Sequence, residues 1–378
     1  METVEKRKRG VAALYALCPV AHIIAAVSGI VIALHLLLRG RQGLMAAVSR
    51  TVVRPVHRAL SQLCSHVGFS VAELLIGCFA ALIMVYITIG VARIIRTENK
   101  LGQVYIIFIR LLAAGLCVYG GFCLLWGAYY YGDDFATASG LDDSEISTEE
   151  LETVTVYFAQ RLNEYGELVT RDGSGLYTVD REALLADSDR VFAAVEEDFP
   201  CLAGPAVRAK GIRFSRVMSY LDFTGFFFPF TAEANVNMDF PPALFAATVA
   251  HELSHQRGVA KEQEANFTAV LAALEYGDTD YCYSACMLAY THLGNALYGA
   301  DRGAWQMVSK GLSEKVRLDM SAGREYWKQF ETPVQTVSNT VYEGFLQSYD
   351  QKLGLQSYGA CVDLLVNYYI DEAEAFYG

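Results

Sequence analysis

The chain has 378 residues, of which 53% are hydrophobic, and a formal net charge of −12 at pH 7. This apolar content is too high for an ordinary soluble protein, and the length is enough for two domains. Residues 1–130 hold 13 Lys and Arg against 4 Asp and Glu, whereas residues 131–378 hold 17 against 38. A basic membrane domain followed by an acidic globular domain is predicted, and nucleic acid is not expected as a partner.

Three apolar runs, at residues 10–38, 67–92 and 111–131, predict three transmembrane helices. The first run is longer than the apolar core of a cleaved signal peptide, which favours an uncleaved anchor. The third run ends in aromatic residues that are typical of a membrane interface. Between the first two runs, residues 39–66 are polar and basic, and they predict either a solvated loop or an amphipathic helix at the membrane interface.

Basic residues predict the orientation of this membrane domain, which we assign to residues 1–131. With the N-terminus inside, eight Lys and Arg residues are cytoplasmic, against five arginines in the first outside loop. The eight are Lys6, Arg7, Lys8, Arg9, Arg93, Arg96, Lys100 and Arg110. We expect a multi-pass protein of the cell membrane, in contact with the lipid bilayer, with a cytoplasmic N-terminus. Three spans then place an acidic linker at 132–150 and a globular domain at 151–378 on the extracytoplasmic side.

The globular domain is predicted to be mostly helical. Ser147 and Glu150 have the spacing of a capping box, which predicts a helix that begins at residue 148. Four cysteines lie in this domain, and an even number allows disulfides outside the cell. They are Cys201, Cys282, Cys286 and Cys361.

Residues 251–255 read HELSH and match HExxH, the pattern of helical zinc peptidase sites. Residues four apart lie on one helix face, so His251 and His255 can bind one Zn²⁺. Glu252 then lies beside the metal, where it can accept a proton from water. Gly258 predicts the end of this helix. The alternative is a buried helix with two hydrogen-bonded histidines and an ion-paired glutamate.

A catalytic zinc site needs a third protein ligand and an open position. Glu262 and Glu264 follow the Gly258 turn, and either carboxylate could reach the metal. Further along the chain, His292 and Tyr290 are candidates for stabilising the oxyanion of a tetrahedral intermediate, with a packed helix face as the alternative explanation for each.

Residues 213–237 are rich in aromatic and β-favouring side chains and predict one or two strands. An edge strand beside the site helix can bind a substrate backbone by strand addition. We assign this function to the segment that begins with Gly225, Phe226, Phe227 and Phe228, with a core hairpin as the alternative.

The segment EQEAN at residues 262–266 resembles the ExxA[DN] element of membrane zinc proteases of the HtpX and CAAX-prenyl-protease type, and of ImmA-like peptidases. This resemblance implies that Glu262 is the third zinc ligand and that Asn266 is a hydrogen-bond partner of the site. Those families have a longer segment between the second histidine and this glutamate, so Glu264 stays open as the alternative ligand.

Over nearly its full length, the chain resembles an uncharacterised bacterial family of multi-span membrane proteins with a domain of unknown function. The segments that carry this resemblance are Phe69–Leu75, Met218–Asn237, the HELSHQRG block and Ser357–Gly359. The resemblance implies a zinc peptidase without an assigned substrate.

We therefore predict a mainly α protein, with three N-terminal transmembrane helices and a mostly helical, zincin-like metallopeptidase domain that contains a small β-element. The expected function is a membrane-anchored, gluzincin-like metallopeptidase that hydrolyses a peptide or protein substrate. Zn²⁺ would be held by His251, His255 and Glu262, and Glu252 would act as general base on a zinc-activated water. The alternative is a non-catalytic, zinc-binding membrane sensor or assembly factor.

Overall fold

The structure is a computed structural model that describes residues 16–349 and 359–377. The chain forms two compact units. The first comprises Val71–Gly132 and the described residues up to Val53. The second comprises Arg54–Ser70 and the described residues from Asp133 onward. The predicted mainly α architecture, with three apolar N-terminal helices and a small sheet, is confirmed.

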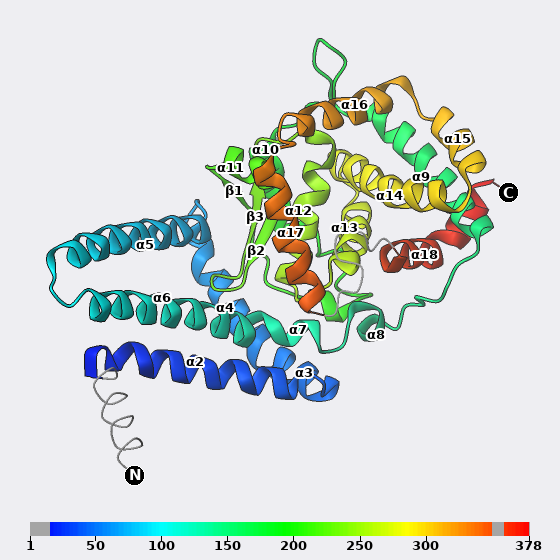
Figure 1. Ribbon diagram of the computed structural model, residues 1–378. Helices are drawn as coiled ribbons and strands as arrows, with labels where there is room; N and C mark the ends of the chain where they lie inside the picture. Colours follow the sequence, from blue (N-terminus) through cyan, green and yellow to red (C-terminus); the bar gives the residue numbers. More distant parts are fainter. Residues whose placement is uncertain (1–15, 350–358, 378) are drawn as a thin grey trace. The chain divides into compact units, whose positions relative to one another are not determined.

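The first unit consists of helices (Figure 1). They are α2 (Pro19–Leu38), α3 (Gln42–Val48), α5 (Val71–Arg96), α6 (Lys100–Phe122) and α7 (Ala128–Tyr130), with π-helical turns at Ser49–Val53 and Cys123–Gly127. Three stretches are long and apolar enough to cross a membrane: Pro19–Leu38, Val71–Arg96 and Lys100–Tyr130. Residues 6–15, with the basic cluster and the start of the first predicted span, lie outside the described residues.

The third apolar helix begins earlier than the predicted residue 111. The Asn99 side chain caps its N-terminus by accepting a hydrogen bond from Gly102 N at 3.0 Å. The helix therefore begins at Lys100 and includes the charged Arg110, whereas the prediction began after that charge.

The second unit is mainly helical with one sheet of three strands. Its helices are α4 (Arg54–Ser65), α8 (Phe135–Ser139), α9 (Thr148–Leu168), α10 (Arg181–Asp187), α11 (Ser215–Tyr220), α12 (Phe245–Gln256), α13 (Glu262–Tyr276), α14 (Thr279–Ala300), α15 (Arg302–Lys310), α16 (Glu314–Lys328), α17 (Pro333–Ser348) and α18 (Gly359–Tyr377). Short 3-10 turns lie at Ser188–Arg190, Pro200–Leu202 and Pro242–Leu244. All nine cysteines are free, so the disulfides that the sequence allowed are not formed.

The sheet has the order β1-β3-β2, with strands β1 (Lys210–Ile212), β2 (Gly225–Phe228) and β3 (Glu233–Asn237). The strand β1 is parallel to β3, and β2 is antiparallel to β3, with Gly225 opposite Val236. This order puts β2 at an edge of the sheet.

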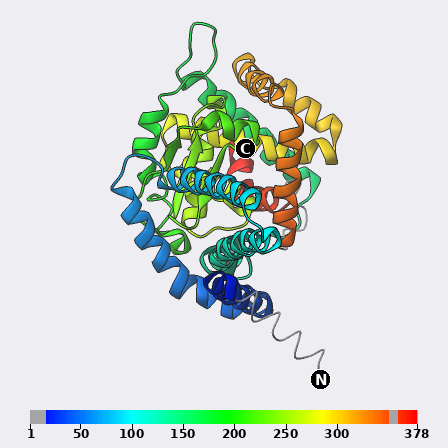
Figure 2. The ribbon, with the colours of Figure 1, turned by 60° about the vertical axis from the view of Figure 1, so that its left-hand side comes forward.

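Helix α12 is almost fully buried within the second unit (Figures 1 and 2). It packs against β2 and β3, and against α13 and α14. Eleven of its residues are buried, and three of them are alanines, Ala246, Ala247 and Ala250. These small side chains let the sheet and the helices approach the backbone of α12 closely. The sequence motif is therefore held by a rigid part of the fold.

The acidic stretch 132–150 differs from the expected linker, because part of it is folded into the second unit. It contains α8, in which Asp134 caps the helix by accepting a hydrogen bond from Thr137 N at 3.0 Å. Phe135 is buried in the core of the unit. The predicted capping box at Ser147 and Glu150 is confirmed at the start of α9. Apolar anchoring by one phenylalanine thus overrides the acidic composition of this stretch.

The segment Arg54–Ser70 also folds onto the second unit, by polar contacts with the sheet. The buried Lys210 side chain donates a hydrogen bond to the Cys64 carbonyl oxygen at 2.7 Å. Ser70 Oγ donates to Asn235 Oδ1 at 2.6 Å, and both residues are buried. For residues 39–66 the sequence left a solvated loop and an amphipathic helix as alternatives. Arg54–Ser65 of this segment is helical, as α4, and is fixed to the sheet.

His57 of α4 lies at this attachment, beside β2. Its ring lies 5.4 Å from the Phe227 ring, and the side chain is buried. Burial lowers the pKa of His57 to about 4 and outweighs the opposing effect of a hydrogen bond to the Pro229 backbone. The unfolded chain, with its ordinary value of 6.5, therefore binds this proton first as the pH falls. The stabilising contribution is complete above pH 6.5 and is lost as the pH falls towards 4, by at most about 3 kcal/mol.

We predict that His57→Gln flattens the decrease in the melting temperature of the full chain between pH 7 and pH 5. The measurement is thermal unfolding of both proteins at a series of pH values. His66→Gln is the matched control, because His66 is an exposed histidine of the same segment. An identical pH slope in wild type and His57→Gln would contradict the prediction.

Candidate metal centre

The turn after α12 brings two helices of the second unit together. Gly258 has a φ of 94°, in the left-handed region that glycine favours, and its N–H donates to the His255 carbonyl oxygen at 2.9 Å. Val259 N donates to the Ser254 carbonyl oxygen at 3.1 Å, which completes the helix end. The predicted helix stop is confirmed, and α13 begins four residues later at Glu262.

His251, His255 and Glu262 form a three-residue cluster between α12 and α13. One ligand atom from each lies within 4.8 Å of the others. His251 Nε2 is 3.2 Å from Glu262 Oε2, and His255 Nε2 is 3.7 Å from Glu262 Oε1. Each carboxylate oxygen thus faces one imidazole, and the three donor atoms surround a common point.

The other ring nitrogen of each histidine is held by a hydrogen bond. His255 Nδ1 lies 2.7 Å from the Val259 carbonyl oxygen, which can only accept, so Nδ1 carries the proton. His251 Nδ1 lies 2.8 Å from Asn266 Oδ1. In a neutral histidine this arrangement leaves the Nε2 lone pair free for the cluster. Metal-binding histidines characteristically have such a partner at their second nitrogen.

Glu264, the other candidate for third ligand, faces away from the cluster. Its Oε2 accepts a hydrogen bond from Phe135 N at 3.0 Å, at the start of α8. Two positions along a helix correspond to a rotation of roughly 200°, so Glu262 and Glu264 of α13 lie on opposite faces. Burial raises the pKa of Glu264 to about 7. The structure therefore groups Glu262, and not Glu264, with the two histidines.

The opposite charges of the cluster shift the pKa values of its members. Burial disfavours the ionised form of Glu262, but the facing His255 and His251 outweigh burial and hold the pKa of Glu262 well below its usual range. Burial likewise disfavours charged His255, but Glu262 outweighs it and raises the pKa of His255 to about 9. The site is thus built to hold a positive charge next to the Glu262 carboxylate. A divalent cation would replace the proton of His255.

Glu252 lies beside the cluster in a closed environment. Only 4% of the residue is exposed, and its Oε2 has no hydrogen-bond partner among the described residues. Its carboxylate packs against Gly225, where an added Cβ would lie 2.5 Å from Oε1. Burial raises the pKa of Glu252 to about 7, although the charges of His251 and His255 partly offset this effect. A buried carboxylate oxygen without a protein partner is available for a water or a substrate.

Tyr342 of α17 contacts the cluster, and sequence reasoning missed it. Its hydroxyl donates to Glu262 Oε1 at 2.9 Å, across 80 residues of sequence. Its ring lies 5.2 Å from that of Phe223, just before β2. No local pattern in the sequence signals this contact, because it depends on how α17 packs against α13 and the sheet.

The two oxyanion candidates on α14 lie in different places. His292 is buried, and burial lowers its pKa to about 4, with a further lowering by the charge of His251. His292 is therefore neutral and near His251, but it does not belong to the three-residue cluster. The Tyr290 hydroxyl lies 3.2 Å from Ser309 Oγ of α15, so this contact directs Tyr290 towards α15 and not to the cluster.

The segment Gly225–Phe228 forms the edge strand β2, which packs against α12. It also forms a hairpin with β3. Its position is therefore compatible with both predicted alternatives, a substrate-binding edge strand and a core hairpin. Gly225 itself touches Glu252.

The donor set fits zinc. Two imidazole nitrogens and one carboxylate are ligands of catalytic zinc sites, which keep a further position for water or substrate. Both histidines have the hydrogen-bond partners that orient such ligands. Glu252 directly follows His251 in the sequence, and its Oε2 has no hydrogen-bond partner among the described residues.

Sequence comparison matches residues 49–366 to a family model described as "Protein of unknown function (DUF3810)". Neither a curated protein nor a solved structure matches the chain. The expected relation to a family with a domain of unknown function is thus confirmed. The similarity to peptidases of the HtpX, CAAX-prenyl-protease and ImmA type stays a prediction.

Proposed function

Because the chain belongs to the DUF3810 family, whose function is unknown, we propose its activity from the site alone: it is a membrane-anchored, zinc-dependent peptidase. The observation that carries the proposal is the cluster of His251, His255 and Glu262, with the buried Glu252 beside it. Two histidines from an HExxH helix and a glutamate from the next helix are a typical set of zinc ligands in a peptidase. The glutamate within the HExxH motif is the general base of such a site.

The chain's own residues divide the chemistry between them. His251, His255 and Glu262 would hold the metal. When bound, zinc acts as a Lewis acid that polarises a peptide carbonyl and makes water nucleophilic near neutral pH. Glu252 Oε2 accepts a proton as water adds to the carbonyl carbon. It returns that proton to the amine nitrogen as the C–N bond breaks, which yields a carboxylic acid and an amine. The Tyr342 hydroxyl orients the Glu262 carboxylate by a hydrogen bond.

The edge strand β2 is the proposed guide for the substrate backbone. An extended peptide that pairs with an edge strand is fixed by main-chain hydrogen bonds, and pairing is independent of its sequence. Gly225, at the start of β2, touches the Glu252 carboxylate, so a peptide along β2 would pass beside the proposed base.

A topology with the site outside the cytoplasm completes the proposal. Three crossings put the connection between the first two apolar helices on the same side as the C-terminal residues. The attachment of Arg54–Ser70 to the sheet of the second unit supports this arrangement. Two of the five loop arginines, Arg54 and Arg58, donate to the Ala203 carbonyl oxygen and are thus engaged within the protein. The remaining excess of basic residues favours a cytoplasmic N-terminus.

A purely structural zinc site, as in a sensor or assembly factor, would have four protein ligands. In the described part of the chain, the group that could hold a metal contains three residues. This number favours the catalytic function.

The proposal is tested by metal removal from the full chain in lipid nanodiscs. Hydrolysis of β-casein, an unfolded protein substrate, should stop with 1,10-phenanthroline and return when zinc is added in excess. A serine-protease inhibitor is the control and should have no effect. Hydrolysis that continues without metal would show that the cluster does not carry the activity.

A further inference from the structure

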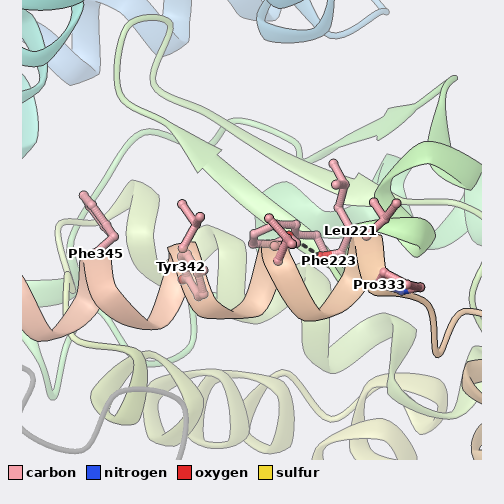
Figure 3. A pocket seen from close by; sticks show the side chains of 9 residues that line it. Leu221, Phe223, Pro333, Tyr342 and Phe345 are labelled. Carbon is pink, nitrogen blue, oxygen red and sulfur yellow. Dashed lines mark hydrogen bonds between the residues drawn. The ribbon is translucent and has the colours of Figure 1, made fainter.

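An apolar groove lies between α17 and the turn that precedes β2 (Figure 3). Its volume is about 710 Å³, within the range of ligand-binding pockets. None of the described residues that line it carries a charge. The lining residues are Leu221, Phe223, Pro333, Val334, Val337, Ser338, Val341, Tyr342 and Phe345.

The wall of the groove on α17 is an exposed apolar stripe. Val334, Val337 and Val341 have helical spacing and are 54%, 63% and 67% exposed. Removing such a stripe from water is favourable, so a ligand that covers it gains binding free energy.

Hydrogen bonds join the α17 wall of the groove to the opposite wall, the turn before β2. Ser338 Oγ donates to the Leu221 carbonyl oxygen at 2.8 Å, and Asn339 Nδ2 donates to Asp222 Oδ2 at 2.8 Å. These bonds keep the apolar walls at a set separation. The groove is therefore preformed, and a ligand does not have to open it.

Tyr342 links the groove to the metal cluster. Tyr342 belongs to its lining, and its hydroxyl reaches Glu262 at 2.9 Å. Phe223, in the opposite wall, is followed two residues later by Gly225, which touches Glu252. A ligand in the groove would thus be one tyrosine side chain away from the metal ligands, on the side where β2 begins.

We propose that this groove binds a bulky apolar side chain of the peptide substrate, at a position that flanks the scissile bond. This inference rests on the proposed peptidase function and adds the substrate class: peptides with leucine- or phenylalanine-like residues at that position. The lining is mostly apolar, so charged or polar side chains of the peptide are disfavoured by desolvation. The adjoining edge strand selects a peptide as the occupant, because it offers main-chain pairing that an acyl chain cannot use.

Two hydroxamates test the proposal without relying on turnover. The first carries an isobutyl side chain next to the zinc-binding group, and the second carries hydrogen at that position. Their dissociation constants are measured by calorimetry on the zinc-loaded full chain in lipid nanodiscs, because free detergent would compete for an apolar groove. Burial of the isobutyl group should make the first compound bind about 10- to 100-fold more tightly.

Val341→Asp puts a charge into the groove wall at an exposed helix position, so the fold should be kept. It should bring the affinity ratio close to 1 while the unsubstituted hydroxamate binds as before. Leu168→Asp is the matched control, because Leu168 is 68% exposed and does not line the groove. It should leave the ratio unchanged.

Four results would overturn the proposal, and they can be distinguished. Equal affinity of both hydroxamates for a zinc-containing wild type would reject the groove alone, as would an unchanged ratio in Val341→Asp. If dodecanoate displaces the isobutyl compound, and if Val341→Asp weakens the binding of these two compounds equally, the groove would be assigned to acyl chains. A protein that holds no zinc and binds neither compound would reject the peptidase function together with the groove.

Discussion

Glu252→Gln should lower the rate of peptide hydrolysis by about 10²- to 10⁴-fold and leave zinc bound. Glutamine has nearly the same volume as glutamate, so it should fill the space beside Gly225 without moving the metal ligands. It cannot accept a proton at neutral pH, which removes the general base and leaves the rest of the site intact. The measurement is the rate of β-casein cleavage by wild type and variant, with zinc content determined on the same samples.

Glu167→Gln is a suitable control, since Glu167 is an exposed acidic residue of the same unit that pairs with Lys315. It should cleave at the wild-type rate. Full activity of Glu252→Gln would show that another group takes the proton, and loss of zinc from it would show that Glu252 belongs to the metal site.

Gly225→Ala should lower hydrolysis by about 10²-fold through a purely steric effect. The added Cβ would lie 2.5 Å from Glu252 Oε1 and 2.7 Å from its Cγ. Both distances are shorter than the contacts that Cβ atoms make in proteins. Either the strand or the glutamate must move, and a displacement of about 1 Å from the reacting atoms costs about this much. Zinc should stay bound, because His251, His255 and Glu262 are not touched. Rates and zinc content are again measured together.

Gly323→Ala is the matched control for this substitution. Gly323 lies on α16, where an added Cβ meets no atom within 4 Å. Its rate should equal that of wild type, and its helix should be slightly more stable. A Gly225→Ala protein with the wild-type rate would mean that the position of Glu252 beside β2 is not the reactive one.

Features that depend on neighbouring residues were predictable from the sequence. The spacing of His251 and His255 determines that they share a helix face, and Gly258 marks the turn that follows. The capping box at Ser147 and Glu150 and the three apolar helices are further examples. In each case the physical cause acts within one or two turns of helix, or within one continuous apolar run.

Features that depend on tertiary packing were not predictable. The choice between Glu262 and Glu264 rests on how the Gly258 turn directs α13, which sets the face that looks back at α12. Tyr342 reaches Glu262 from a helix 80 residues away. Phe135 anchors an acidic stretch whose composition is that of a linker.

The zinc content of the purified full chain tests the central claim most directly, with wild type measured beside Glu262→Ala and Glu264→Ala. The three samples are compared at equal helical content by circular dichroism, so that a misfolded variant is recognised. We expect one zinc per chain in wild type and in Glu264→Ala, and none in Glu262→Ala. A folded wild type without zinc would contradict the peptidase proposal, and zinc that is lost only from Glu264→Ala would contradict the assigned third ligand.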